Sequence, residues 1–150
     1  MSPSYAESLL QYDLWANNRV FEALQPFEQA IPDSILEIMS HILGAKQVWY
    51  NRAQEIPSTK DLFKKENKEN LVKCNESLHQ LWSGLIHRNE PNGMIIKYTN
   101  FAGEEFSNSL AELITHMVNH GSYHRGQVAR ITRESGHPPL ATDFIIFSRK

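Results

Sequence analysis

The chain has 150 residues, which is long enough for one compact domain with a hydrophobic core. Hydrophobic residues make up 41% and charged residues 21% of the sequence, as is usual for a soluble globular protein. The 15 basic and 17 acidic residues are mixed along the chain and leave a formal net charge of -2, which argues against nucleic acid as a partner.

Two further features bear on location. The first residues, MSPSYAESLL, lack the basic start and apolar centre of a signal peptide, and no apolar run approaches the roughly 18 to 20 residues of a membrane-spanning helix. Cys74 is the single cysteine, so the chain has no internal disulfide and suits a reducing compartment. We therefore expect a cytoplasmic protein that has no membrane partner, with Cys74 acting as a small buried hydrophobic residue.

Hydrophobic periodicity predicts two helices in the first third of the chain. The first covers residues 5–25 and ends before Pro26, because proline cannot continue a helix. The second covers residues 34–54, and the spacing of Ser34 and Glu37 predicts a capping box at its start. The residues expected to form the buried stripe of the first helix are Tyr5, Leu9, Tyr12, Ala16, Val20 and Leu24.

A third helix is predicted over residues 59–88, with an irregular first half that is rich in lysine, glutamate and asparagine. Its second half, LVKCNESLHQLWSGLI, is clearly amphipathic. The segment after it, residues 94–109, alternates enough to suggest a short hairpin or an extended loop.

A fourth helix is predicted over residues 109–135. Ser109 and Glu112 again have the capping-box spacing, and Gly136 with the prolines that follow it forms a firm stop. The apolar tail, residues 141–150, should pack along the helices or against a second subunit. Four long amphipathic helices predict an all-α fold, a single four-helix-bundle domain over residues 1–150 with one short hairpin or extended segment.

The fourth helix carries three of the chain's seven histidines, His116, His120 and His124, each four residues after the last. Side chains at this spacing lie one above the other, and two imidazoles can reach one ion at about 2.0 to 2.1 Å. A helical projection places His124 inside the apolar face, His120 at its flank and His116 at the polar margin. Histidines directed at a core need partners for their ring nitrogens, and a metal ion or ordinary hydrogen bonds would satisfy them equally well.

The candidates for a third ligand are His41, His79, His87 and His137. We expect His79 and His87 on the surface of the third helix and His137 in a loop. His41 lies beside the apolar face of the second helix, and the small residues Gly44–Ala45 leave room for an ion and a substrate. His41 is therefore the preferred third ligand, and His116 is expected to stand beside the site.

Two other metal templates fit the sequence less well. A zinc protease needs His-Glu-x-x-His, but the residues after the first two histidines of the run are Met117 and Gly121. A di-iron bundle needs two Glu-x-x-His pairs on helices, which residues 76–79 and 134–137 match by letter. The second pair straddles a helix stop and cannot direct both groups inward.

Three segments together resemble the DinB-like (DinB/YfiT-like) family of metal-dependent enzymes. They are YDLWANNRVFEAL, MSHILGAKQVWYNR and HMVNHGSYHRGQVARITRESGHPPLATDFIIF, and the likeness extends over essentially the whole chain. The family's triad takes one histidine from the second helix and two, four apart, from the fourth, which correspond to His41, His120 and His124. The resemblance implies a four-helix bundle, often a homodimer, with one zinc or nickel ion per site.

The resemblance also implies a class of reaction. Relatives include transferases and an isomerase that depend on low-molecular-weight thiols such as bacillithiol or mycothiol. We therefore expect a metal-dependent thiol S-transferase or a hydrolase that acts on a small-molecule substrate. The sequence does not single out a general base; Tyr123 and His116 are both candidates. Trp15 and Trp49 are expected to pack in the core, and Gln127 to orient a ligand. The competing interpretations are a non-catalytic stress-response bundle that binds a metal or a small molecule, and a purely structural bundle with hydrogen-bonded histidines.

Overall fold

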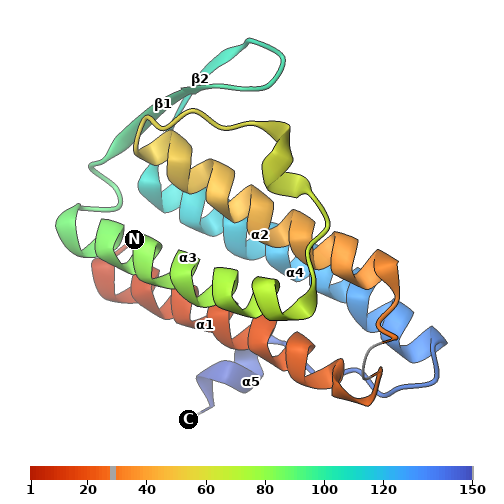
Figure 1. Ribbon diagram of the computed structural model, residues 1–150. Coiled ribbons are helices and arrows are strands. Elements are labelled where there is room, and N and C mark those ends of the chain that lie inside the picture. Colours follow the sequence, from red (N-terminus) through yellow and green to blue (C-terminus); the bar gives the residue numbers. More distant parts are fainter. Residues whose placement is uncertain (28–29, 150) are drawn as a thin grey trace.

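The computed structural model describes residues 1–27 and 30–149, and this part of the chain is mostly helical (Figure 1). It contains five α-helices, two short 3-10 helices and one two-stranded sheet. The elements in chain order are α1 (Pro3–Ala23), η1 (Gln25–Phe27), α2 (Asp33–Ala53), η2 (Lys60–Phe63), α3 (Lys68–Arg88), β1 (Ile95–Thr99), β2 (Glu105–Ser109), α4 (Leu110–Glu134) and α5 (Phe144–Ser148). Among these helices none is both long and apolar enough to cross a membrane.

The four long helices lie side by side, and each packs against two of the others. Helix α1 contacts α3 and α4, and α2 contacts the same two helices from the other side (Figure 1). The buried side chains form two clusters along this assembly. One cluster contains Leu10, Trp82 and Ile114 and lies toward the hairpin, and the other contains Leu24, Met39 and Val128.

The start of α1 follows from its first residues. The side chain of Ser2 accepts a hydrogen bond from the amide of Tyr5, and Pro3 occupies the first turn, where its missing N–H costs nothing. The predicted stripe from Leu9 to Leu24 is buried. Tyr5 was wrongly placed in that stripe: it is exposed, because Ala6 is the residue of this turn that faces the core.

The two predicted capping boxes have different outcomes. At the start of α4 the Ser109 hydroxyl accepts from the Glu112 amide, and the Glu112 carboxylate accepts from the Ser109 amide at 2.7 Å, as predicted. At α2 the prediction was wrong. The residue before the helix is Pro32, which has no hydrogen-bonding side chain, and Ser34 already lies inside the first turn.

The third helix is shorter than the sequence indicated. It begins at Lys68, where the side chain of Asn67 accepts from the amide of Asn70, and residues 60–63 form the separate 3-10 helix η2. Helix η2 lies directly on α2 at Gly44, where a Cβ atom would collide with the carbonyl oxygen of Leu62. The irregular first half that the composition suggested is therefore a loop held against α2.

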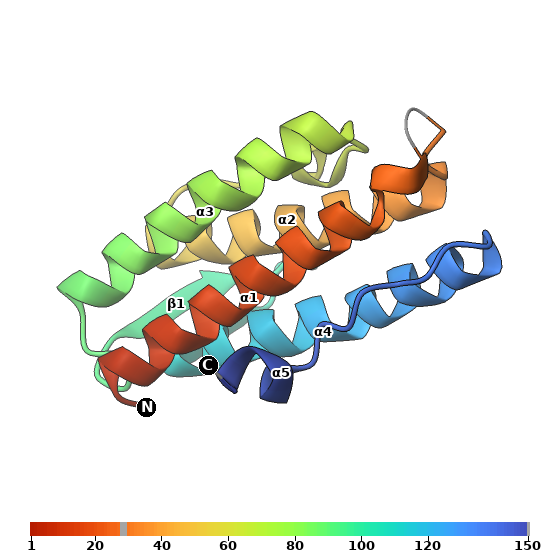
Figure 2. The ribbon, with the colours of Figure 1, turned by 90° about the horizontal axis from the view of Figure 1, so that it is seen from below.

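The hairpin and the tail complete the structure. Strands β1 and β2 pair antiparallel, with Ile95 opposite Ser109, where a hairpin or extended loop was expected. The tail returns along α1 as α5 (Figure 2), and the ring of Phe144 meets that of Tyr12 edge-on at 5.1 Å. Its last residue, Lys150, lies outside the described residues. Cys74 is half-buried beside the second cluster, and burial raises the pKa of its thiol.

Candidate metal centre

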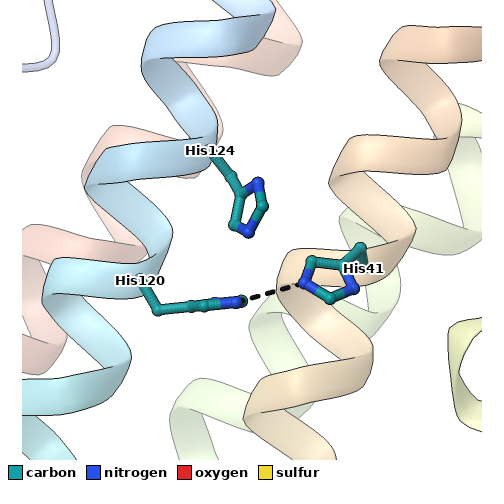
Figure 3. A group of neighbouring side chains, drawn as sticks. All are labelled: His41, His120 and His124. Carbon is teal, nitrogen blue, oxygen red and sulfur yellow. Dashed lines mark hydrogen bonds between the residues drawn. The ribbon is translucent and has the colours of Figure 1, made fainter.

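Three histidines from two helices meet in the space between α2 and α4 (Figure 3). His41 comes from α2, and His120 and His124 come from consecutive turns of α4. The Nε2 atoms of His41 and His120 are 3.1 Å apart, and one ring nitrogen from each of the three residues lies within 4.8 Å of the others. The structure therefore brings together the three residues that the sequence analysis selected.

The ring of His124 closes the cluster from above in the view of Figure 3. Its centroid lies 4.5 Å from that of His120 and 4.7 Å from that of His41. Its Nδ1 atom lies 3.0 Å from Oε1 of Gln127, an amide oxygen that can only accept a hydrogen bond. The tautomer that donates from Nδ1 to this oxygen leaves the lone pair of Nε2 to face the other two rings.

This donor set fits a divalent metal ion. Two nitrogen ligands at about 2.0 to 2.1 Å from one tetrahedral ion lie about 3.3 Å apart. The 3.1 Å between the Nε2 atoms of His41 and His120 is close to that separation. All three side chains are only partly buried, so solvent reaches the cluster.

The protonation state also suits metal binding, since an imidazole must be neutral to act as a ligand. Partial burial, followed by the nearby charges of His124 and His41, lowers the pKa of His120 to about 4. Burial and the charge of His124 lower the pKa of His41 as well. Both imidazoles are therefore neutral at pH 7.

Aromatic side chains flank the cluster on two sides. The ring of Phe63, on η2, stacks on His41 at 5.4 Å between centroids. On the other side, His116 lies 5.7 Å from His120 and 5.2 Å from the ring of Trp49. His116 thus stands beside the cluster, as predicted, and partial burial and the charge of Arg52 lower its pKa.

The remaining histidines lie elsewhere in the fold. His137 follows α4 and packs its ring against Phe27 at 4.2 Å. His87 is exposed and contacts the backbone carbonyl of Ser83. His79 is half-buried, and its Nδ1 atom is buried without a hydrogen-bond partner, so the expectation of a simple surface residue was incomplete.

A buried group of charges lies behind the histidines, and the sequence analysis missed it. The carboxylate of Asp13 forms ion pairs with Lys46 and Arg125, each at 2.8 Å, and all three side chains are almost fully buried. Arg125 also donates to Asn17 at 2.9 Å. Burial by itself raises the pKa of the Asp13 carboxyl. Lys46 and Arg125 together have the larger, opposite effect, so the pKa lies below its ordinary value.

The ion cluster touches the candidate metal centre. Asp13, Lys46, Trp49 and His120 line one small cavity of about 10 Å³. The negative charge of Asp13 raises the pKa of His120, although burial and the neighbouring imidazoles have the larger opposite effect. The one signal in the sequence was the position of Asp13, four residues after Leu9 on the face of α1 that is buried.

Comparison with known proteins places this arrangement in a family. The sequence profile of the DinB family matches residues 1–150. The chain belongs to the DinB family. It is also 28% identical to Protein DinB of Bacillus subtilis (strain 168), over an alignment of 172 positions that covers 95% of this chain and 93% of the relative. No solved structure matches the chain.

The region that matches the DinB family contains all residues of the candidate site. The matched region includes His41 on α2 and the His120–His124 pair on α4, together with the three charged residues behind them. The resemblance inferred from the sequence motifs is therefore confirmed at the level of the family.

Proposed function

We propose that this DinB-family protein is a cytoplasmic metal-dependent enzyme in which His41, His120 and His124 hold one divalent ion, zinc or nickel. The observation that carries the proposal is the convergence of three partly buried imidazoles on one point, with the pKa values of His41 and His120 lowered. Three protein ligands and an open position are typical of catalytic zinc sites, whereas structural sites use four protein ligands.

The reaction we favour is the transfer of a low-molecular-weight thiol to an electrophilic small molecule. An ion at this site would lower the pKa of a thiol, or of a water molecule, to near neutrality. In the transfer, the sulfur forms a bond to the electrophilic carbon, and the leaving group departs with the electron pair of the bond that breaks. The thiol proton passes to solvent. Hydrolysis at the same centre would use water in place of the thiol.

The side chains around the cluster would hold the ligands in position. The Gln127 amide oxygen would hold the proton of His124 on Nδ1, and Phe63 stacks on the His41 ring. Because Gly44 lets η2 lie against α2, Phe63 can reach this ring. Two of the three ligands, His41 and His124, therefore have a packing or hydrogen-bonding partner that restricts rotation of the ring.

Metal analysis tests the first part of the proposal. Protein without an affinity tag, purified without a nickel column, should contain about one zinc or nickel ion per chain. His41→Ala, His120→Ala and His124→Ala should each lose it, since two remaining imidazoles bind a divalent ion weakly. His87→Ala is the matched control, because His87 is exposed and far from the cluster in the sequence. A wild-type protein without metal, or metal retained by the His120→Ala variant, would refute this assignment.

Turnover tests the second part. The metal-loaded protein should accelerate the loss of monobromobimane or chlorodinitrobenzene only when a thiol is present, and His120→Ala should abolish the acceleration. Product formed without thiol would assign the hydrolase instead. Metal binding without either reaction would assign the non-catalytic metal-binding module.

We further propose that the four long helices form a four-helix bundle and that two copies associate as a homodimer. The support for a dimer is the apolar outer side of α5, where Ile145 and Ile146 are exposed. Analytical ultracentrifugation should give a dimer for the wild type and a monomer for the Ile145→Lys/Ile146→Lys variant. A monomeric wild type at micromolar concentration would contradict the proposal.

A further inference from the structure

The guanidinium group of Arg52, near the end of α2, is enclosed by aromatic rings. Its Cζ atom lies 4.3 Å from the ring centroid of Trp49, 4.8 Å from that of Tyr98 and 5.7 Å from that of Phe101. Tyr98 belongs to β1, and Phe101 belongs to the turn of the hairpin. Cation–π contacts of this kind hold the planar group in one orientation.

Within residues 1–27 and 30–149, Arg52 forms no ion pair or hydrogen bond with another side chain. The other cations near the site differ, because Lys46 and Arg125 share the carboxylate of Asp13. Partial burial lowers the pKa of Arg52, although the guanidinium keeps its charge at neutral pH. Its five N–H donors in a rigid fork match the two oxygens of a carboxylate.

Arg52 lines a surface pocket of about 480 Å³ between the end of α2 and the hairpin. The hairpin lies over this end of α2 in Figure 1. Lys97 adds a second positive charge to the lining, Glu55 is its acidic residue, and Ile56 and Phe101 supply apolar surface. The pocket therefore combines a fixed cation with walls that suit the apolar body of a small molecule.

The pocket and the histidine cluster lie on the same side of α2. His41, Ala45, Trp49 and Arg52 follow one another at helical spacing, and His41 and Arg52 are separated by about 16 Å along the axis. The guanidinium leans back over Trp49, toward the histidines. Its distance from the cluster is therefore shorter than the axial separation of the two residues, which is within the length of one elongated small molecule.

Aromatic contacts connect the Arg52 pocket to the histidine cluster along two edges of the surface between them. On one edge, Trp49 touches Arg52 and His116, and His116 touches His120. On the other edge, Phe101 contacts Phe63 at 6.4 Å between ring centroids, and Phe63 stacks on His41. The small side chain of Ala45, which is only partly buried, lies between these edges on α2.

We propose that Arg52 binds the carboxylate of an elongated small molecule whose reactive end reaches His41, His120 and His124. This inference rests on the proposed function, and it assigns the substrate class: an elongated carboxylate-bearing molecule, shorter than the axial separation of about 16 Å between His41 and Arg52. Arg52 would then determine specificity, since it contacts the substrate at the end opposite to the reacting atoms.

Matched thiols that differ in charge test the proposal. We would titrate 8-mercaptooctanoate and 8-mercaptooctan-1-ol by calorimetry into the metal-loaded and the metal-free protein. The wild type should bind the carboxylate at least about tenfold more tightly in both forms, because a charge-assisted hydrogen bond contributes more than 1.4 kcal/mol, which is a factor of ten. Arg52→Gln should remove this preference and leave the affinity for the alcohol unchanged.

Control variants separate charge from packing. Arg133→Gln changes an exposed arginine at the far end of α4 and should leave the preference intact. Arg52→Lys keeps the stem and the charge but loses the planar fork, so the preference should fall two- to tenfold. This variant carries the test if Arg52→Gln disturbs the hairpin.

The outcomes distinguish this inference from the proposed function. A wild type without preference for the carboxylate, or an Arg52→Gln variant that weakens both thiols equally, would overturn the role of Arg52. If metal increases the affinity for neither thiol, but the metal-free protein still prefers the carboxylate to the alcohol, the proposed metal-dependent reaction is refuted and the carboxylate site is retained.

Discussion

Replacing Asp13 by asparagine removes the one acidic group that contacts Lys46 and Arg125 within the described part of the chain. The two cations differ in what they would retain. Arg125 keeps hydrogen bonds to Asn17 and Ser122, whereas Lys46 has no other side-chain partner there. The variant therefore leaves an almost fully buried ammonium group without a counter-charge.

The expected loss is large for a protein of this size. Removing one partner of a buried ion pair costs about 3 to 5 kcal/mol, and the whole free energy of unfolding is about 5 to 15 kcal/mol. With a urea m-value of about 2 kcal/mol/M, the unfolding midpoint should fall by roughly 2 M. The direction in which this contribution to the free energy of unfolding changes with pH follows from the lowered pKa of Asp13. Its stabilisation is complete above the unfolded-state pKa of about 3.9 and is lost as the pH falls through the lower folded-state value.

Urea unfolding at pH 7, followed by far-ultraviolet circular dichroism, measures this loss. The second variant, Asp13→Asn/Lys46→Met, removes the stranded ammonium and should recover part of the stability, because an apolar side chain of similar length fills the same buried position. If Asp13→Asn shifts the midpoint by less than about 0.5 M, or if the double variant is less stable than the single one, the ion cluster does not contribute as we argue.

Three other predictions concern the candidate metal centre. In thermal unfolding, Gly44→Ala should destabilise the protein by about 1 to 3 kcal/mol, and it should weaken metal binding, because the added Cβ displaces η2. Gly126→Ala is the control and should be neutral or stabilising, since a Cβ at this position meets no atom within 4 Å. Gln127→Ala should weaken zinc affinity about 10- to 100-fold in a chelator competition, since His124 loses its hydrogen-bond acceptor; an unchanged affinity would remove Gln127 from the site. The pKa of His120 is about 4 in the folded state and about 6.5 in the unfolded state, so the metal-free protein should lose stability as the pH falls from 6.5 toward 4. His120→Ala should reduce this dependence of the free energy of unfolding on pH. An equal pH dependence in both proteins would contradict the lowered pKa.

Local sequence signals were sufficient for most of the secondary structure. Helical periodicity located the four long helices, and the Ser109–Glu112 box is present because both groups lie within one turn of each other. The errors arose where neighbouring residues compete for the same role. Pro32 occupies the N-cap position of α2, where Ser34 was expected to cap, and Ala6 faces the core in place of Tyr5. Such choices depend on which residue begins the helix and on what packs against it.

The histidines show how far the sequence alone determines the candidate site. The four-residue spacing of His120 and His124 is a property of one helix, and it survives in any packing. Their meeting with His41 required α2 and α4 to lie side by side, and the family motifs indicated that arrangement before the structure did. The charges behind the histidines come from three helices with no common spacing, so only the tertiary structure could bring Asp13 to Lys46 and Arg125. The physical reason is range: periodicity and capping act within a turn or two of one helix, whereas a buried ion pair forms only between residues that packing makes neighbours.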